Sequence, residues 1–230
     1  MTIPTIEDSA FEGHTTFGNS GTITLSLVTP SDGDYILLAT ACDFSNGLII
    51  DATSVTNGWV EIVSDEELND ASLLVWGKEY STGDANPGFE LVSGNEPLGT
   101  TIIRISGYNN AITVHGTVAV ENASTAPTAP DLTTTNNNAK VFRICSTDDG
   151  DETVLTTPST QLTTDGSVGY GGNNGFRLAV SQEDKATAGS VGTADFTSVD
   201  AEGSVIATVA VYGVTSGGGS ILPLINHYNG

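Results

Sequence analysis

Apolar and polar residues alternate with a period of two in several short segments, and this alternation limits the fold more than any other feature of the chain. Ile23, Leu25 and Leu27 alternate with Thr and Ser, and the same pattern recurs over residues 112–120 and 205–211. Because successive side chains of a strand point to opposite faces of a sheet, the alternation predicts strands with one buried face and one hydrated face.

Turn residues separate further apolar runs, as expected for short antiparallel strands. Examples are Asp32-Gly33, Asn46-Gly47 and Asn57-Gly58. Additional strands are expected at residues 35–42, 48–52, 59–63, 72–80, 100–107, 140–145 and 176–181. One helical turn is expected near Asp65–Leu68, where a loop is equally compatible with the sequence. The pattern predicts an all-β fold, an antiparallel β-sandwich of jelly-roll-like type.

A weak internal repeat with a spacing of 104 residues organises these strands. It relates Tyr108 to Tyr212 and places Leu37 on Val141. We therefore expect two similar copies, over residues about 22–110 and 126–214, that pack together. A Pro-containing connector joins them. Residues 1–21 are expected to form an extended N-terminal arm, and residues 215–230 a glycine-rich tether followed by a docking peptide.

Charge excludes several classes of function. The chain has 28 Asp and Glu against 6 Lys and Arg, a formal net charge of −22 over 230 residues. A diffuse negative surface repels nucleic acid and anionic lipid, so neither is expected as a partner. No apolar run reaches the roughly 20 residues of a membrane span. The first residues lack the basic and apolar regions of a secretory signal, so none is expected.

Candidate metal and thiol sites are weak in this sequence. Asp148, Asp149 and Asp151 lie close together and could bind calcium, but they lack the ligand spacing of an EF-hand, which favours a hydrated hairpin loop. Cys42 and Cys145 sit in apolar runs, which favours two buried thiols over a disulfide. The three histidines lack zinc spacing, and no cofactor is expected.

Catalytic motifs are also missing from the sequence. It contains no Gly-x-Ser-x-Gly elbow, and its many acids single out no pair for glycoside hydrolysis. We therefore expect a protein without enzymatic activity. Aromatic residues offer a possible platform for stacking sugars. The residues considered for this platform are Trp59, Trp76, Tyr80, Tyr108 and Tyr170. Trp59 and Trp76 are expected in the core, and Tyr170, in a glycine-rich loop, is the best exposed candidate for contact with a glycan.

Four short segments of the chain resemble a known module. They are residues 31–39 (SDGDYILLA), 57–59 (NGW), 73–80 (LLVWGKEY) and 101–108 (TIIRISGY). Together they resemble a β-sandwich module of structural proteins of tailed bacteriophages and of some bacterial surface proteins. The second copy lacks the Gly-Trp pair, and residues 173–175 (NNG) replace its expected turn. The resemblance implies a virion surface protein of the capsid decoration, cement or head-fibre type, and it implies no catalytic residues.

The resulting hypothesis is a non-enzymatic virion protein, made in the host cytoplasm and placed on the outer capsid surface. Its expected partners are the major capsid protein or other virion subunits, with self-association also possible. The terminal segments are expected to make the assembly contacts, through Ile3, Ile6, Phe11, Phe17, Ile221, Leu222, Leu224, Ile225 and Tyr228. The alternative is a carbohydrate-binding or host-attachment module that binds host glycans, and a glycosidase is the third hypothesis.

Overall fold

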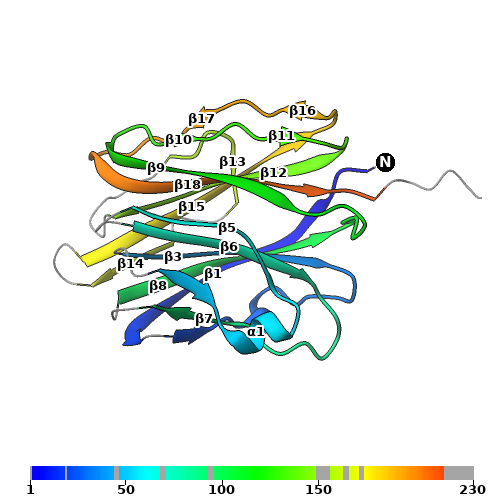
Figure 1. Ribbon diagram of the computed structural model, residues 1–230, viewed down its shortest axis with the longest axis horizontal. Helices are drawn as coiled ribbons and strands as arrows, with labels where there is room; N and C mark the ends of the chain where they lie inside the picture. Colours follow the sequence, from blue (N-terminus) through cyan, green and yellow to red (C-terminus); the bar gives the residue numbers. More distant parts are fainter. Residues whose placement is uncertain are drawn as a thin grey trace, which may run out of the picture.

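A computed structural model of the chain consists mostly of β-strands. The structure describes residues 2–18, 20–43, 47–67, 71–92, 96–148, 156–162, 166–170 and 174–214. Two large antiparallel sheets lie face to face, and smaller β elements cover the outer side of each one (Figure 1). The expected all-β, sandwich-like class of fold is confirmed.

The first large sheet uses the N-terminal half of the chain. Its five strands follow the order β1-β8-β3-β6-β5, and all neighbours are antiparallel. The strands are β1 (Thr5–Gly18), β8 (Glu96–Ser106), β3 (Tyr35–Asp43), β6 (Ala71–Glu79) and β5 (Val60–Glu67). All nine residues of β3 are buried, as expected for the central strand of a sheet that is covered on both faces.

The second large sheet uses the C-terminal half. Its order is β13-β15-β12-β18-β9, and β14 also pairs with β15. Its strands are β13 (Thr160–Gln161), β14 (Gly166–Tyr170), β15 (Asn174–Lys185), β12 (Ala139–Asp148), β18 (Glu202–Tyr212) and β9 (His115–Ser124). Each large sheet thus takes its strands from one half of the chain, and the jelly-roll detail of the expectation is not confirmed.

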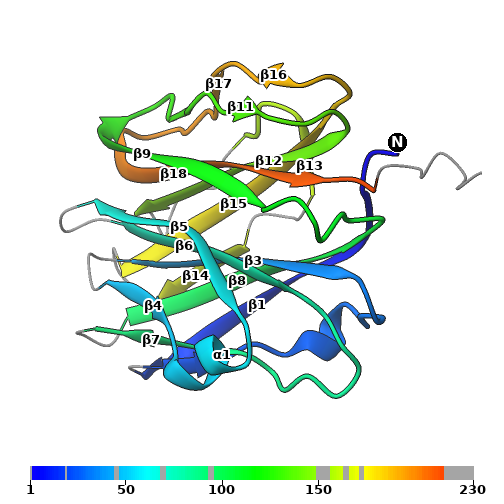
Figure 2. The same ribbon diagram turned by 45° about the vertical axis from the view of Figure 1, so that its right-hand side comes forward.

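The main core lies between the two large sheets. Alternate residues of their inner faces meet there, including Leu37 and Leu73 from the first sheet and Phe142, Leu178 and Val209 from the second. The sheets stack so that β5 lies beside β9 and β1 lies beside β14 (Figures 1 and 2). Burial of apolar area in this layer is the dominant stabilising term of the fold.

A small cap closes the outer face of the first sheet. It contains the three-stranded sheet β2 (Ser20–Thr22), β7 (Gly88–Leu91) and β4 (Leu48–Ile50), with the 3₁₀ turn η1 (Leu25–Leu27) and helix α1 (Ala52–Thr56). Asp51 caps α1, because its side chain accepts a 2.6 Å hydrogen bond from the Ser54 amide. A second apolar core forms beneath this cap and buries Trp59 and Trp76, as the sequence predicted.

Two short ribbons cover the outer face of the second sheet. They are β10 (Thr128–Ala129) with β17 (Ala194–Asp195), and β11 (Thr133–Thr134) with β16 (Gly189–Ser190). The molecule therefore has four layers, with the large sheets in the middle (Figure 2). Cys42 and Cys145 are buried in the outer cores of different sheets, as the preference for two buried thiols predicted.

Two local expectations are wrong. Residues 65–67 form the end of edge strand β5, not a helical turn, because β6 pairs with their backbone. Asp65 and Glu66 are exposed on this edge, whereas Glu67 is buried. Residues 23–27 form a turn with η1 instead of a strand. Ile23 and Leu25 are buried there all the same, beneath the first cap.

The expected N-terminal arm is part of the first sheet. β1 pairs with β8 over most of its length, and Ile6 and Phe11 pack against the core between the sheets. Gly99 opposite β1 makes the space for the Phe11 ring, since a Cβ atom there would lie 2.5 Å from its Cζ atom. The predicted boundary at residue 22, between a free arm and the first copy, is therefore wrong. The predicted start of the second copy at residue 126 is wrong as well, because β9 begins at His115 and belongs to the second sheet.

The repeat spacing of 104 also needs correction. The two large sheets have matching strand orders, and Leu37 pairs with Gly77 and Ile103 just as Phe142 pairs with Gln182 and Val209. Leu37 and Phe142 both face the main core, whereas Val141 faces the outer cap, so the match of Leu37 to Val141 places opposite faces of the two sheets on each other. A one-residue slip exchanges the two faces of a strand. Descent of the two halves from one duplicated unit stays a prediction.

Candidate functional site

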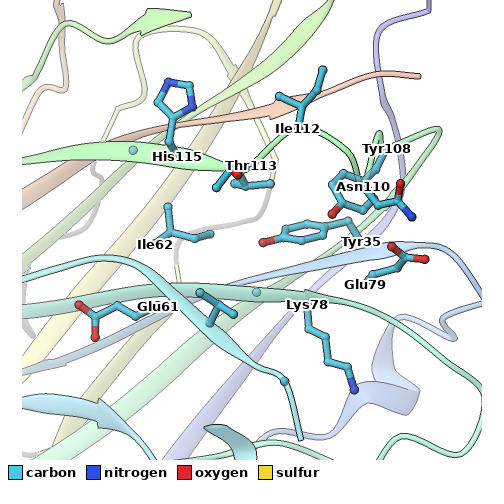
Figure 3. Close-up of a pocket in the computed structure, with 15 residues that line it drawn as sticks. Tyr35, Glu61, Ile62, Lys78, Glu79, Tyr108, Asn110, Ile112, Thr113 and His115 are labelled. Carbon is cyan, nitrogen blue, oxygen red and sulfur yellow. The ribbon is translucent and has the colours of Figure 1, made fainter. Parts of the chain in front are cut away.

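A groove at one end of the sandwich is the best-formed candidate site in the described residues. It holds a volume of about 540 Å³ and lies between the first sheet and the segment that leads into β9 (Figure 3). We call it the tyrosine groove. It is lined by Tyr35, Gly58, Val60, Glu61, Ile62, Gly77, Lys78, Glu79, Tyr108, Asn110, Ile112, Thr113, Val114, His115 and Gly116.

Two tyrosines from distant parts of the chain meet in this groove. Tyr35 begins β3 and Tyr108 follows β8, and their ring centroids lie 4.6 Å apart with the ring planes tilted by 42°. Tyr35 is only 6% exposed, whereas Tyr108 is half-buried. Gly77 leaves room for the Tyr35 ring, because a Cβ atom on Gly77 would lie 2.6 Å from the Tyr35 hydroxyl oxygen.

Both phenols stay protonated well into the alkaline range. Burial raises the pKa of Tyr35 far above its usual value, and the neighbouring Tyr108 adds to this shift. Burial also raises the pKa of Tyr108, and the negative charge of Glu79 contributes. The groove therefore presents two neutral hydroxyl groups, each able to donate and to accept a hydrogen bond.

The segment that carries Tyr108 is held in place by the last strand of the second sheet. Tyr108 forms a β-bridge with Gly213, the Asn109 amide donates to the Tyr212 carbonyl at 2.8 Å, and the Val214 amide donates to the Gly107 carbonyl at 2.9 Å. The Asn109 side chain also accepts a 3.0 Å hydrogen bond from the Ala111 amide. This backbone support fixes the groove wall before any ligand arrives.

The charges of the groove are negative or already paired. Lys78 is its only cationic side chain among the described lining residues, and its Nζ atom lies 2.7 Å from Asp84 Oδ1. Glu61 and Glu79 are the other charged lining residues. His115 lines the groove, but its ring is turned away and stacks on Tyr212, with the centroids 5.5 Å apart (Figure 3). An anionic ligand would therefore meet net repulsion.

The arrangement is suited to the binding of a ligand. Within the described residues, no group of three or more His, Cys, Asp or Glu side chains could hold a metal ion. The described lining side chains also lack a serine or cysteine nucleophile beside a histidine base. Apolar walls with a few convergent polar groups are typical of ligand sites, and the volume falls in their usual range.

A second surface feature lies close to the groove. Ile49, Val55 and Val60 are 41%, 55% and 60% exposed, and they line a hollow of about 470 Å³ above the buried ring of Trp59. We call these three residues the valine patch. The patch spans β4, α1 and β5, and it shares Val60 with the tyrosine groove. Large apolar side chains grouped on a strongly acidic surface are typical of a contact site.

The predicted site residues are only partly described. Asp148 is the last residue of β12, while Asp149 and Asp151 lie outside the described residues, so the calcium hypothesis stays a prediction. Tyr170 belongs to β14, with its side chain outside the described part, and the same holds for Phe17 in β1. The predicted C-terminal contacts, Ile221, Leu222, Leu224, Ile225 and Tyr228, also lie outside the described residues.

The N-terminal contact residues are used within the molecule. Ile6 and Phe11 pack against the main core, and Ile3 is half-buried. The prediction that these residues form a free arm for contacts with other subunits is therefore wrong. The sequence did not predict the contact between Tyr35 and Tyr108. A signal was present, because an aromatic residue at the first position of an apolar strand sits at the end of a sheet, where clefts form.

Comparison with protein-family models, with curated proteins and with solved structures gives no match to this chain. Within the described ranges, every helix is too short or too polar to pass through a lipid bilayer.

Proposed function

We propose that this protein is a non-enzymatic structural component of a bacteriophage virion that decorates or cements the outer capsid surface. The observation that carries the proposal is the valine patch, since a body coated with carboxylates keeps three large apolar side chains together in contact with solvent. Burial of such a patch against a subunit of the particle would release water from apolar surface and stabilise attachment.

The distribution of charge supports the same role. All six cationic residues lie in the described part of the chain, and ion pairs with carboxylates involve Lys78, Arg104, Lys140 and Arg143. Most of the 28 acids therefore remain uncompensated. A negative exterior repels other copies and nucleic acid, which suits an outward-facing protein, whereas the apolar patch and the uncharged tail of residues 215–230 are suited to contact.

Rebinding to particles tests the proposal. Virions produced without the protein would be incubated with purified wild type, with a Val55→Glu/Val60→Glu double variant and with a chain lacking residues 216–230. The bound copies would be counted after gradient sedimentation. We expect the wild type to co-sediment and both changed proteins to lose at least about tenfold in affinity, equivalent to roughly 1.4 kcal/mol.

Val199→Glu is the matched control, because Val199 is 66% exposed and lies between β17 and β18, outside the valine patch. It introduces the same charge away from the patch and should rebind normally. Absence of the protein from purified virions, together with failure of the wild type to co-sediment, would overturn the virion assignment. Normal rebinding of the double variant would remove the patch as the contact surface. A role in binding host glycans is compatible with decoration.

A further inference from the structure

The hydroxyl group of Tyr35 has an unusual position. The residue is 94% buried, yet no described residue forms a hydrogen bond with its phenol oxygen or with that of Tyr108. Figure 3 shows both oxygens on the side of the rings that points into the tyrosine groove, toward Ile62 and Thr113. Buried hydroxyl groups normally find a partner within the protein. A polar group that is fixed by packing and left open toward a cavity is prepared for a ligand.

Other polar side chains line the groove, at the end away from the Tyr35 oxygen (Figure 3). Glu79 supplies a hydrogen-bond acceptor, and Asn110 supplies both a donor and an acceptor. Figure 3 shows the two side chains at the same end of the groove as the Tyr108 ring. A ligand with hydroxyl groups spread around its rim, which both donate and accept, can bond to partners at the two ends of the groove.

The aromatic surface accommodates a single ring. Because the Tyr35 and Tyr108 centroids are 4.6 Å apart, the two rings pack on each other and form one platform rather than two walls of a slot. The half-buried Tyr108 offers its accessible surface to the groove, with Tyr35 as support. A pyranose has an apolar face of C–H groups that stacks on an aromatic ring and a rim of hydroxyls that bonds to polar neighbours.

From this geometry we propose that the tyrosine groove binds one neutral pyranose unit of a glycan, with Tyr108 as the stacking residue and with the Tyr35 hydroxyl, Glu79 and Asn110 as its hydrogen-bond partners. Glu61 and Glu79 disfavour sialic or uronic acids, because Lys78, the cation of the groove, is already paired with Asp84. The site is separate from the role proposed above, and its failure would leave capsid decoration untouched.

A proline-rich peptide is the main rival for an aromatic groove. Peptides of that type dock into successive slots between spaced aromatic side chains, whereas the groove offers one platform and a polar end. The chain's own segment 221–225 is a second rival, since Val214 lies beside the groove at Gly107. Both rivals are separated from a sugar by direct binding measurements.

The test uses the full chain and a chain lacking residues 215–230. Both would be applied to an array of neutral, amino and acidic glycans. Binding of the methyl glycosides of glucose, galactose, mannose and N-acetylglucosamine would then be followed by NMR titration. We expect a neutral glycan to bind in one or both forms. Tyr108→Ala should weaken binding at least about tenfold, and Tyr35→Phe and Asn110→Ala several-fold each.

Asn136→Ala is the matched control for Asn110→Ala, because Asn136 is exposed and lies outside the groove. Near-ultraviolet circular dichroism would show that each variant keeps the native packing. Tyr108→Phe keeps the platform and should bind better than Tyr108→Ala. The proposal is overturned if neither form binds a neutral glycan, if only acidic glycans bind, or if binding survives Tyr108→Ala unchanged. Binding of a proline-rich peptide in place of sugars would overturn it in favour of that rival.

Discussion

The indole nitrogen of Trp76 donates a 3.0 Å hydrogen bond to the hydroxyl oxygen of Thr40, deep in the core beneath the first cap. Thr40 also bonds to the hydroxyl of Thr100 at 3.0 Å, and all three residues are fully buried. The chain of contacts crosses β6, β3 and β8, so a polar group from each of three neighbouring strands is satisfied without water.

Thr40→Val should destabilise the fold more than Thr100→Val. The first change leaves the buried indole N–H of Trp76 without an acceptor, which costs about 1–3 kcal/mol. The second change leaves Thr40 able to accept from Trp76 and removes only the bond between the two hydroxyl groups, so a smaller loss of about 1 kcal/mol is expected. Urea unfolding at neutral pH measures both free energies. Equal losses for the two variants would contradict this hierarchy.

The loss of folding stability at alkaline pH should depend on Tyr35. Because burial raises the pKa of this phenol, the folded state keeps its proton at a pH where the unfolded state, with a pKa near 10, releases it. The stabilising contribution is complete below pH 10. Above pH 10 it is lost by about 1.4 kcal/mol per pH unit, until the folded state also ionises. Tyr35→Phe should therefore match the wild type at pH 8 and exceed it in stability at pH 11.

Urea unfolding of the two proteins at pH 8, 10 and 11 checks this expectation. The difference between them isolates the Tyr35 contribution from that of other alkaline groups, including Tyr108. A constant difference over the three pH values would contradict the burial of the phenol.

The strands were predictable because turn chemistry marks their ends. Gly33 and Gly58 follow Asp and Asn in the sequence, and both adopt positive φ, at 82° and 87°, a conformation that favours glycine. The start of helix α1 also has a local signal, because Asp is a preferred N-cap residue and Asp51 directly precedes the helix. Local sequence was therefore enough for most element positions.

Local sequence could not predict the register of the strands or the position of the tyrosine groove. β3 and β12 carry mostly apolar residues on both faces, because a cap covers each outer side. Apolar and polar residues therefore do not alternate along these strands, and a shift of the pairing by one residue would still place apolar side chains against each other. The meeting of Tyr35 with Tyr108 depends on the pairing of β3 with β8, where Tyr35 lies opposite Ile105. Only the register of the sheet brings these residues to the same end of the sandwich.

Arg143 should stabilise the contact between the second sheet and the segment that covers its outer face. Its guanidinium is 2% exposed, and its Nη2 atom lies 2.7 Å from Glu183 Oε1. It also donates to the carbonyls of Val191 and Gly192, both at 3.1 Å. Arg143→Met would leave these acceptors without their donor, so we expect a loss of about 3 kcal/mol, near the lower end for a broken buried pair, because Glu183 is 37% exposed and can rehydrate.

Glu183→Gln is the comparison for Arg143. The amide oxygen of Gln can still accept from the guanidinium, so a loss of about 1 kcal/mol is expected. Arg143→Lys keeps the charge but removes the planar fork, and should fall between the other two. Thermal unfolding gives the order of the three variants. A larger effect for Glu183→Gln than for Arg143→Met would show that the backbone contacts of Arg143 are unimportant.

The N-terminal strand should be required for stability, in contrast to a free arm. The Phe11 ring fits over Gly99 beside Phe176, whose Cζ atom would lie 2.6 Å from a Cβ atom on Gly99. Removal of this half-buried ring by Phe11→Ala should cost about 2–3 kcal/mol, less than for a fully buried phenylalanine. Val199→Ala, at a position 66% exposed, should change the stability by less than about 0.5 kcal/mol.

Deletion of residues 1–18 should have a larger effect than Phe11→Ala, because β8 would become an unprotected edge strand. The truncated protein should self-associate, which light scattering would detect. An arm that only grips neighbours would give the opposite result: full stability and a monomeric body in both altered proteins.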